Sequence, residues 1–133
     1  MRDELSTKDK GLSNKPQDIG ERVFNFAVRI LKMTQSLPKT YVNVAIINQI
    51  IRSVTSIGAN IEEARGAHTK TDFAYGMNIA KKEARETIYW LKLIIEMNPS
   101  FGSRLNLLLQ ENQEIIKILT AIVKTAKPRT FSS

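Results

Sequence analysis

The residue types that could carry out chemistry are few in this sequence, and their positions limit what they could do. The chain has no cysteine and a single histidine, His68. Disulfides, thiolate metal sites, a cysteine nucleophile and a multi-histidine metal site are therefore excluded. We expect His68 to be a solvated residue of the loop that follows Gly66, not a ligand or an acid–base group.

Two pairs of glutamates stand close together in the sequence, Glu62-Glu63 and Glu83-x-x-Glu86. A di-iron site in a helical bundle needs inward glutamates and a Glu-x-x-His motif on each of two helices. Neither group has a histidine at that spacing, so we expect no metal and no cofactor. An enzyme that used Glu63 with neighbouring basic groups would need a concave pocket around this carboxylate. We favour a non-enzymatic protein with no catalytic residue.

Polar residues on the second and third helical segments could instead form structural contacts. Lys82 and Glu86 are four positions apart, so they can pair within one helix. If the two segments are antiparallel neighbours, Glu63 could also meet Lys82 or Arg85. The polar network that we predict consists of Asn60, Glu63, Glu86 and Asn112.

Basic residues give the strongest indication of a ligand. The 20 lysines and arginines exceed the 13 acidic residues, which gives a formal charge of +7. Basic side chains in rows on helices attract phosphates without reading sequence, and this attraction weakens with salt. Lysines near a helix C-terminus could also merely complement its dipole and aid solubility. The candidate contacts to RNA or DNA are Lys81, Lys82, Arg85, Lys92, Lys117, Lys124, Lys127 and Arg129.

The elements that position these residues can be predicted from proline placement and apolar spacing. All four prolines lie between strongly periodic segments, where proline is tolerated, and none lies inside one. The predicted helices begin at Asp18 with a capping box, at Lys39 or Thr40, at Thr71-Asp72 and at about Ser103. The second ends at Arg65 and the fourth at Ala126.

Apolar residues recur at three-and-four spacing in each segment, which is typical of helices. The row of the second helix is Val42, Ala45, Ile46, Ile50, Val54, Ile57, Ile61 and Ala64. Val44, Ile47 and Ile51 lie outside it, so we expect a second subunit to cover them. In the fourth helix Asn112 occupies the apolar row and is predicted to face inward.

Four helices of similar length joined by short connections predict an all-α, antiparallel up-down-up-down four-helix bundle over residues 18–126. Residues 1–17 and 127–133 are predicted to be mobile tails. Small residues on the second and third helices, among them Gly58, Ala64 and Gly76, predict a close approach of their backbones. The N-terminal residues have no apolar core typical of a signal peptide, and no apolar stretch is long enough to span a bilayer, so we expect a cytoplasmic protein without membrane contact.

Three stretches resemble a known family. They are Ser56-Ile57-Gly58-Ala59-Asn60-Ile61-Glu62-Glu63-Ala64, Ile79-Ala80-Lys81-Lys82-Glu83-Ala84-Arg85-Glu86-Thr87, and Tyr89-Trp90-Leu91, with Asp72-Phe73 between the first two. With them the chain resembles, over about residues 18–126, the four-helix-bundle protein family first met as open reading frames in intervening sequences of bacterial 23S ribosomal RNA genes.

The resemblance implies a bundle that assembles as a ring, commonly a homopentamer, with a basic surface. The accessory variability determinant of diversity-generating retroelements is similar in fold, and it binds nucleic acid and a reverse transcriptase. A reverse-transcriptase partner is implied for this chain by family analogy alone. The leading hypothesis is a homo-oligomeric protein that binds RNA or DNA, and the alternative is a protein–protein interaction scaffold without nucleic-acid binding.

Overall fold

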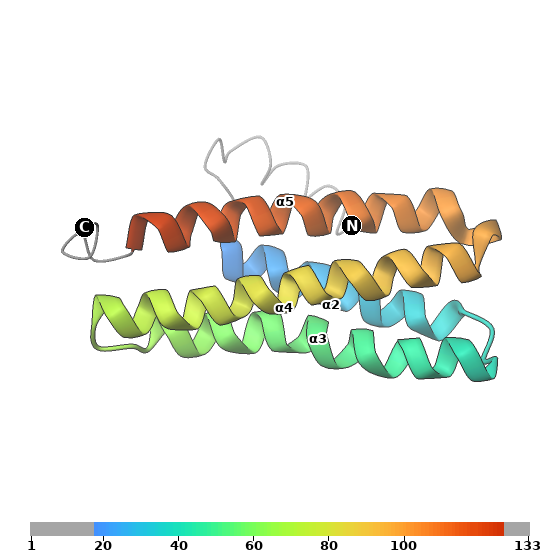
Figure 1. Cartoon of the computed structure of the whole chain (residues 1–133), viewed down its shortest axis with the longest axis horizontal. Helices are drawn as coiled ribbons and strands as arrows, with labels where there is room; N and C mark the ends of the chain where they lie inside the picture. Colours follow the sequence, from blue (N-terminus) through green and yellow to red (C-terminus); the bar gives the residue numbers. More distant parts are fainter. Residues whose placement is uncertain (1–17, 127–133) are drawn as a thin grey trace, which may run out of the picture.

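The computed structural model describes residues 18–126, which form four long antiparallel helices (Figure 1). Their bounds are α2 (Ile19–Ser36), α3 (Tyr41–Arg65), α4 (Lys70–Met97) and α5 (Gly102–Ala126), with a short 3-10 turn, η1 (Pro99–Phe101), before α5. The predicted all-α four-helix bundle is confirmed. The predicted tails, and with them Lys127 and Arg129, lie outside the described residues.

Polar side chains cap the first turns of the first two helices, as expected from the sequence. Asp18 accepts a hydrogen bond from the backbone N–H of Glu21 at 3.1 Å. This is one of the two hydrogen bonds that make up a capping box. Thr40 accepts one from the N–H of Asn43 at 3.0 Å. Each cap satisfies a backbone donor that has no partner within the helix.

The third and fourth helices begin slightly earlier than predicted. Thr69 caps α4 by accepting from the N–H of Asp72 at 3.0 Å, so α4 begins at Lys70 and includes Thr71 in its first turn. The α5 helix begins at Gly102, directly after η1. Apolar residues at three-and-four spacing appear only after the first turn of each of these helices. The spacing therefore predicts a start that is slightly late.

The core runs along the inner faces of all four helices. Its largest fully buried side chains are Val23, Phe26, Ile30, Ile50, Ile57, Ile61, Met77, Leu91, Ile94, Leu105, Ile115 and Leu119. Phe26 and Ile30 follow the three-and-four apolar spacing that the sequence predicts to face inward in the first helix. Near the ends of α4 and α5, Ile94 and Val123 are buried, whereas their neighbours Ile95 and Ile122, which the apolar spacing predicts to face inward, only pack against the core from its edge.

The row predicted for the start of the second helix was wrong at Val42 and Ala45, whereas Ile46 is buried as predicted. Val42 and Ala45 are exposed, whereas Asn43, Ile46 and Ile47 are buried. Each of the two exposed residues precedes a buried one by one position, which is a rotation of about 100° around the helix. Ile47 therefore belongs to the protein's own core and is not available to a second subunit.

Asn43 is buried because it has a partner far away in the sequence. Its Nδ2 donates to Oδ1 of Asn98 at 2.9 Å, and Nδ2 of Asn98 donates to Oδ1 of Asn43 at 3.0 Å. Asn98 also donates to the carbonyl of Ile94, and Asn43 to that of Pro38. This reciprocal amide pair fixes the start of α3 against the end of α4.

The helices share interfaces of unequal extent. Those of α4 with α3 and with α5 are extensive, and α2 packs less extensively against α3 and α5. At Gly76 a Cβ atom would lie only 2.9 Å from Cβ of Ala64, so the predicted close approach of α3 and α4 is confirmed there. At Gly58 a Cβ would make an ordinary 3.6 Å contact with Val23, so this glycine is not required by packing.

Within residues 18–126, none of the helices combines the length and apolar character needed to cross a membrane.

Candidate nucleic-acid interface

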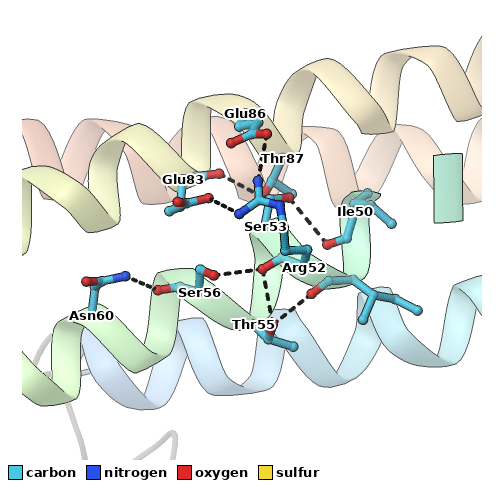
Figure 2. A network of polar contacts seen from close by, with 10 residues as sticks. Ile50, Arg52, Ser53, Thr55, Ser56, Asn60, Glu83, Glu86 and Thr87 are labelled. Atoms are coloured by element: carbon cyan, nitrogen blue, oxygen red, sulfur yellow. Dashed lines mark hydrogen bonds and ion pairs between the residues drawn. The ribbon is translucent and has the colours of Figure 1, made fainter. Parts of the chain in front are cut away.

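Two acidic residues of α4, Glu83 and Glu86, lie on the side that faces α3, where one arginine pairs with both (Figure 2). Nη2 of Arg52 is 2.6 Å from Oε2 of Glu86, and its Nη1 is 3.3 Å from Oε1 of Glu83. The hydrogen bond from Arg52 lowers the pKa of Glu86 below its usual value, and the same bond raises the pKa of Arg52. Both carboxylates are thus paired with one guanidinium of α3.

A buried hydroxyl pair beneath this ion cluster sets the register of the two helices. The hydroxyls of Ser53 and Thr87 are 2.8 Å apart and both residues are fully buried. Thr87 also donates to the backbone carbonyl of Glu83 at 2.8 Å. Because Ser53 adjoins Arg52 in the chain, this contact keeps the guanidinium opposite the glutamates of α4.

The other side of α4 faces α5 through Asn112, which is fully buried as its position in the apolar row predicted. In the amide orientation that its neighbours require, Nδ2 of Asn112 donates to the carbonyl of Ala84 and its Oδ1 accepts from the N–H of Ile88, both at 3.2 Å. Lys81 and Arg85 each precede one of these two residues by three positions. They therefore lie toward the α5 side of the helix.

The predicted basic row of α4 is accessible to solvent. Lys82, Arg85 and Lys92 are exposed and Lys81 is half-buried. The ion pairs found among residues 18–126 involve none of these four side chains. The predicted pair of Lys82 with Glu86 was wrong, because Glu86 lies within reach of Arg52 and binds it instead.

The predicted basic residues of α5 are also accessible to solvent. Lys117 is exposed and its Nζ is 3.4 Å from Oε2 of Glu114, one turn earlier in the same helix. Lys124 is exposed in the last turn. An exposed pair such as that of Lys117 contributes little to stability, so its lysine can exchange the carboxylate for a phosphate.

The predicted polar network does not form as a single cluster. Glu86 belongs to the Arg52 ion cluster and Asn112 lies between α4 and α5, whereas Asn60 donates to the carbonyl of Ser56 in its own helix at 2.8 Å (Figure 2). Glu63 is exposed, and within the described part of the chain its predicted pairing with Lys82 or Arg85 does not occur. The two helices approach at Ala64, which places the neighbouring Glu63 outside the interface.

Sequence reasoning missed Arg52, the residue that organises this site. A signal was present in the small residues Ala64 and Gly76, which predict where α3 meets α4. Ala64 lies opposite Gly76, and in antiparallel helices a step back along α3 matches an equal step forward along α4. Arg52, twelve residues before Ala64, therefore lies near residue 88, within a turn of Glu86. The missing step was to convert the expected close approach into a register.

A shallow groove of about 340 Å³ lies on the opposite side of the molecule, between α2 and α3. Its walls are mainly apolar, and Phe24 at its edge is 67% exposed. Small residues of α3, including Gly58 and Ala59, form its floor. This is an apolar surface that another protein chain could cover.

Within residues 18–126, no group of three or more histidine, aspartate or glutamate side chains is placed so that it could hold a metal ion.

Comparisons with protein families and with solved structures agree. Residues 15–121 match the family model described as 23S rRNA-intervening sequence protein. A crystal structure of a protein with unknown function from the S23 ribosomal protein family of Bacteroides thetaiotaomicron VPI-5482 is 38% identical in sequence, with a TM-score of 0.73. The match covers 80% of this chain and 99% of that one. None of the curated proteins matches the chain.

Proposed function

The chain belongs to the 23S rRNA-intervening sequence protein family, and we propose that it is a non-enzymatic protein that binds RNA or DNA through phosphate contacts on the outer face of α4 and α5. The observation that supports this most is the division of charge on α4. Arg52 pairs with both Glu83 and Glu86 on the α3 side, and the basic side chains on the other side of α4 have no acidic partner among the described residues.

The basic row is long enough to follow several phosphates. Lys81 and Lys92 are eleven residues apart, which is about 16 Å along a helix. One strand of a duplex presents about five phosphates over that length. The binding is expected in the cytoplasm, as predicted from the sequence.

Assembly of several copies forms part of the same proposal. The apolar groove between α2 and α3, with exposed Phe24 at its edge, supports a homo-oligomer. The pentameric stoichiometry rests on the family resemblance alone, and so does a reverse-transcriptase partner. A ring of identical basic faces would increase the affinity for a long nucleic acid, because weak sites on one particle act together. Light scattering at micromolar concentration should give a multiple of the monomer mass.

Gel-shift titration of a structured RNA at several salt concentrations tests the binding. We expect retention that weakens steeply with salt, and a slope of log affinity against log salt that becomes shallower by about one when one phosphate contact is removed. Arg85→Ala should show this change. Arg29→Ala removes an equal charge from an exposed position of α2. It is the matched control and should leave the slope unchanged.

The second candidate function is a protein–protein interaction scaffold, for which the apolar groove is the specific support. It predicts no retention of RNA or DNA even at low salt, together with an unchanged particle mass in Arg85→Ala. In that case the basic face serves solubility only.

A further inference from the structure

We propose that the nucleic acid held by α4 is single-stranded, and that its unpaired bases stack on Tyr89 and Tyr75. This inference rests on the proposed binding of nucleic acid and specifies its class. It follows from the aromatic residues that accompany the basic row, which phosphate contacts alone do not require.

Tyrosines and basic residues alternate along the outer side of α4. Tyr75, Lys82 and Tyr89 follow one another at intervals of seven, so they lie along one line of the helix. Tyr75 is 70% exposed and Tyr89 is 57% exposed. Arg85 and Lys92 flank Tyr89 at offsets of four and three. A ligand that follows the cations therefore passes over Tyr89, and it reaches Tyr75 if it continues along the same line of the helix beyond Lys82.

Tyr89 is already oriented before any ligand binds. Its ring meets that of Trp90 edge to face, with centroids 5.0 Å apart and planes inclined by 70°. Trp90 is half-buried and packs against the core, so it provides a fixed support. A base that stacks on Tyr89 meets a ring with little remaining freedom to lose.

A single strand suits this surface better than a duplex. In a duplex the bases stack on each other and the exterior presents phosphate and sugar, so an exposed tyrosine ring gains little. Proteins that bind single strands without sequence preference combine a basic track with aromatic stacking platforms. Tyr75 and Tyr89 are about 21 Å apart along the helix, so they would contact bases several nucleotides apart.

Fluorescence anisotropy with the full chain can test this, using a labelled 20-nucleotide oligo(dT) and a 20-base-pair duplex at one salt concentration. We expect Tyr89→Ala to weaken oligo(dT) binding by roughly 5- to 150-fold, as base stacking predicts, and to change duplex binding by less than twofold. Tyr89→Phe keeps the ring and should restore binding. Tyr41→Ala removes a tyrosine that is 91% exposed at the start of α3 and should have no effect.

Two further readouts separate stacking from a general loss of charge or fold. The salt slope for oligo(dT) should be the same in Tyr89→Ala as in the unmodified protein, because no phosphate contact is lost. Trp90 is the only tryptophan of the chain, so its fluorescence should change when oligo(dT) binds beside it. Far-ultraviolet circular dichroism verifies that the variant is folded.

The outcomes distinguish this inference from the proposed function. Equal or tighter binding of the duplex, with Tyr89→Ala indistinguishable from the unmodified protein, overturns the single-strand inference and leaves phosphate binding intact. Absence of binding to either nucleic acid at low salt overturns the proposed function, and the inference with it.

Discussion

At the scale of single residues, Arg52 is the side chain that ties two carboxylates of α4 to α3. Arg52→Ala should lower the free energy of unfolding by less than about 1 kcal/mol, because the ion cluster is partly exposed to solvent. It should also raise the pKa of Glu86 toward its ordinary value. Carbon-detected NMR titration measures the pKa of Glu86 in the variant and in the unmodified protein, and Lys32→Ala at an exposed position of α2 serves as the control.

The pH dependence of this contribution has a definite sign. Arg52 holds the pKa of Glu86 below its ordinary value of 4.5, so the folded state releases this proton more readily than the unfolded chain. The stabilisation is present above pH 4.5 and is lost as the pH falls through the lower pKa of the folded state. Denaturant titrations from pH 7 to pH 3 should show a smaller acid-dependent loss in Arg52→Ala than in the unmodified protein.

Asn112 is a polar residue whose replacement by an apolar one of similar size should not lower the free energy of unfolding, in contrast to the replacement of Arg52. Its amide contacts Ala84 and Ile88, whose backbone groups also face each other within α4, so an apolar residue there leaves neither group without a partner. Asn112→Leu should therefore keep or raise the free energy of unfolding, by up to about 1 kcal/mol. Asn112→Ala, which leaves a cavity, should lower it by about 1–3 kcal/mol. Urea denaturation of both variants measures the difference, and a clear destabilisation by leucine would contradict the interpretation.

Sequence predicted the positions of individual side chains better than their partners. The spacing placed Asn112 inside correctly, because a residue's phase on its own helix is local information. It did not identify Asn43 as buried, since that residue depends on Asn98, 55 positions away. It paired Glu86 with Lys82 in the same helix, because the competing Arg52 becomes visible only after two helices are placed in register.

At the scale of elements, Gly76 and Gly58 form a matched pair for testing how closely helices pack. Gly76→Ala should lower the free energy of unfolding by about 1–3 kcal/mol, because the new Cβ would lie 2.9 Å from that of Ala64. Gly58→Ala has room for a methyl group and should raise it by up to about 1 kcal/mol through helix propensity. Thermal and urea denaturation measure the change in the free energy of unfolding of both variants.

A second substitution tests whether the contact between α3 and α4 is the cause. Ala64→Gly combined with Gly76→Ala moves the methyl group to the other helix and should recover most of the lost stability. Ala64→Gly alone should lower the free energy of unfolding, since glycine weakens α3. An increase in stability from Ala64→Gly alone would indicate a different origin.

The helix α2 should unfold locally at a lower free energy than the other helices. It is the shortest, with 18 residues, and it packs less extensively than α4. A two-pronged ion pair of Arg22 with Glu111, with contacts of 2.7 and 2.9 Å, ties it to α5. Native-state hydrogen exchange should show α2 amides opening at a lower free energy than those of α4. Arg22→Ala should lower the opening energy of α2 by about 1 kcal/mol and leave α4 unchanged.

The bounds of the helices could be predicted to within one or two residues, because prolines and capping side chains such as Asp18 and Thr40 act locally. The inward rows were less accurate at the helix ends. Ile94 and Val123 replace their neighbours in the core because a pattern read over twenty residues drifts relative to the real helix. Tertiary packing, which the spacing does not contain, decides which neighbour is buried.

At the scale of the whole molecule, the net charge of +7 indicates attraction to phosphates but not the face that provides it. The face becomes apparent only from the division of charge on α4. If about five cations contact a single strand, affinity should fall by roughly a hundredfold when monovalent salt rises from 50 to 200 mM. Anisotropy titrations measure this, and a change of less than threefold would indicate that the face does not bind phosphates.

An even number of antiparallel helices also decides where the chain enters and leaves. The start of α2 and the end of α5 point toward the same end of the bundle, and the connections before α3 and before α5 lie at the opposite end (Figure 1). A fusion partner or an immobilising tag joined to either flank would therefore be anchored at one common pole. Orienting the bundle by that pole would leave its long sides, including the tyrosine-bearing one, facing the medium.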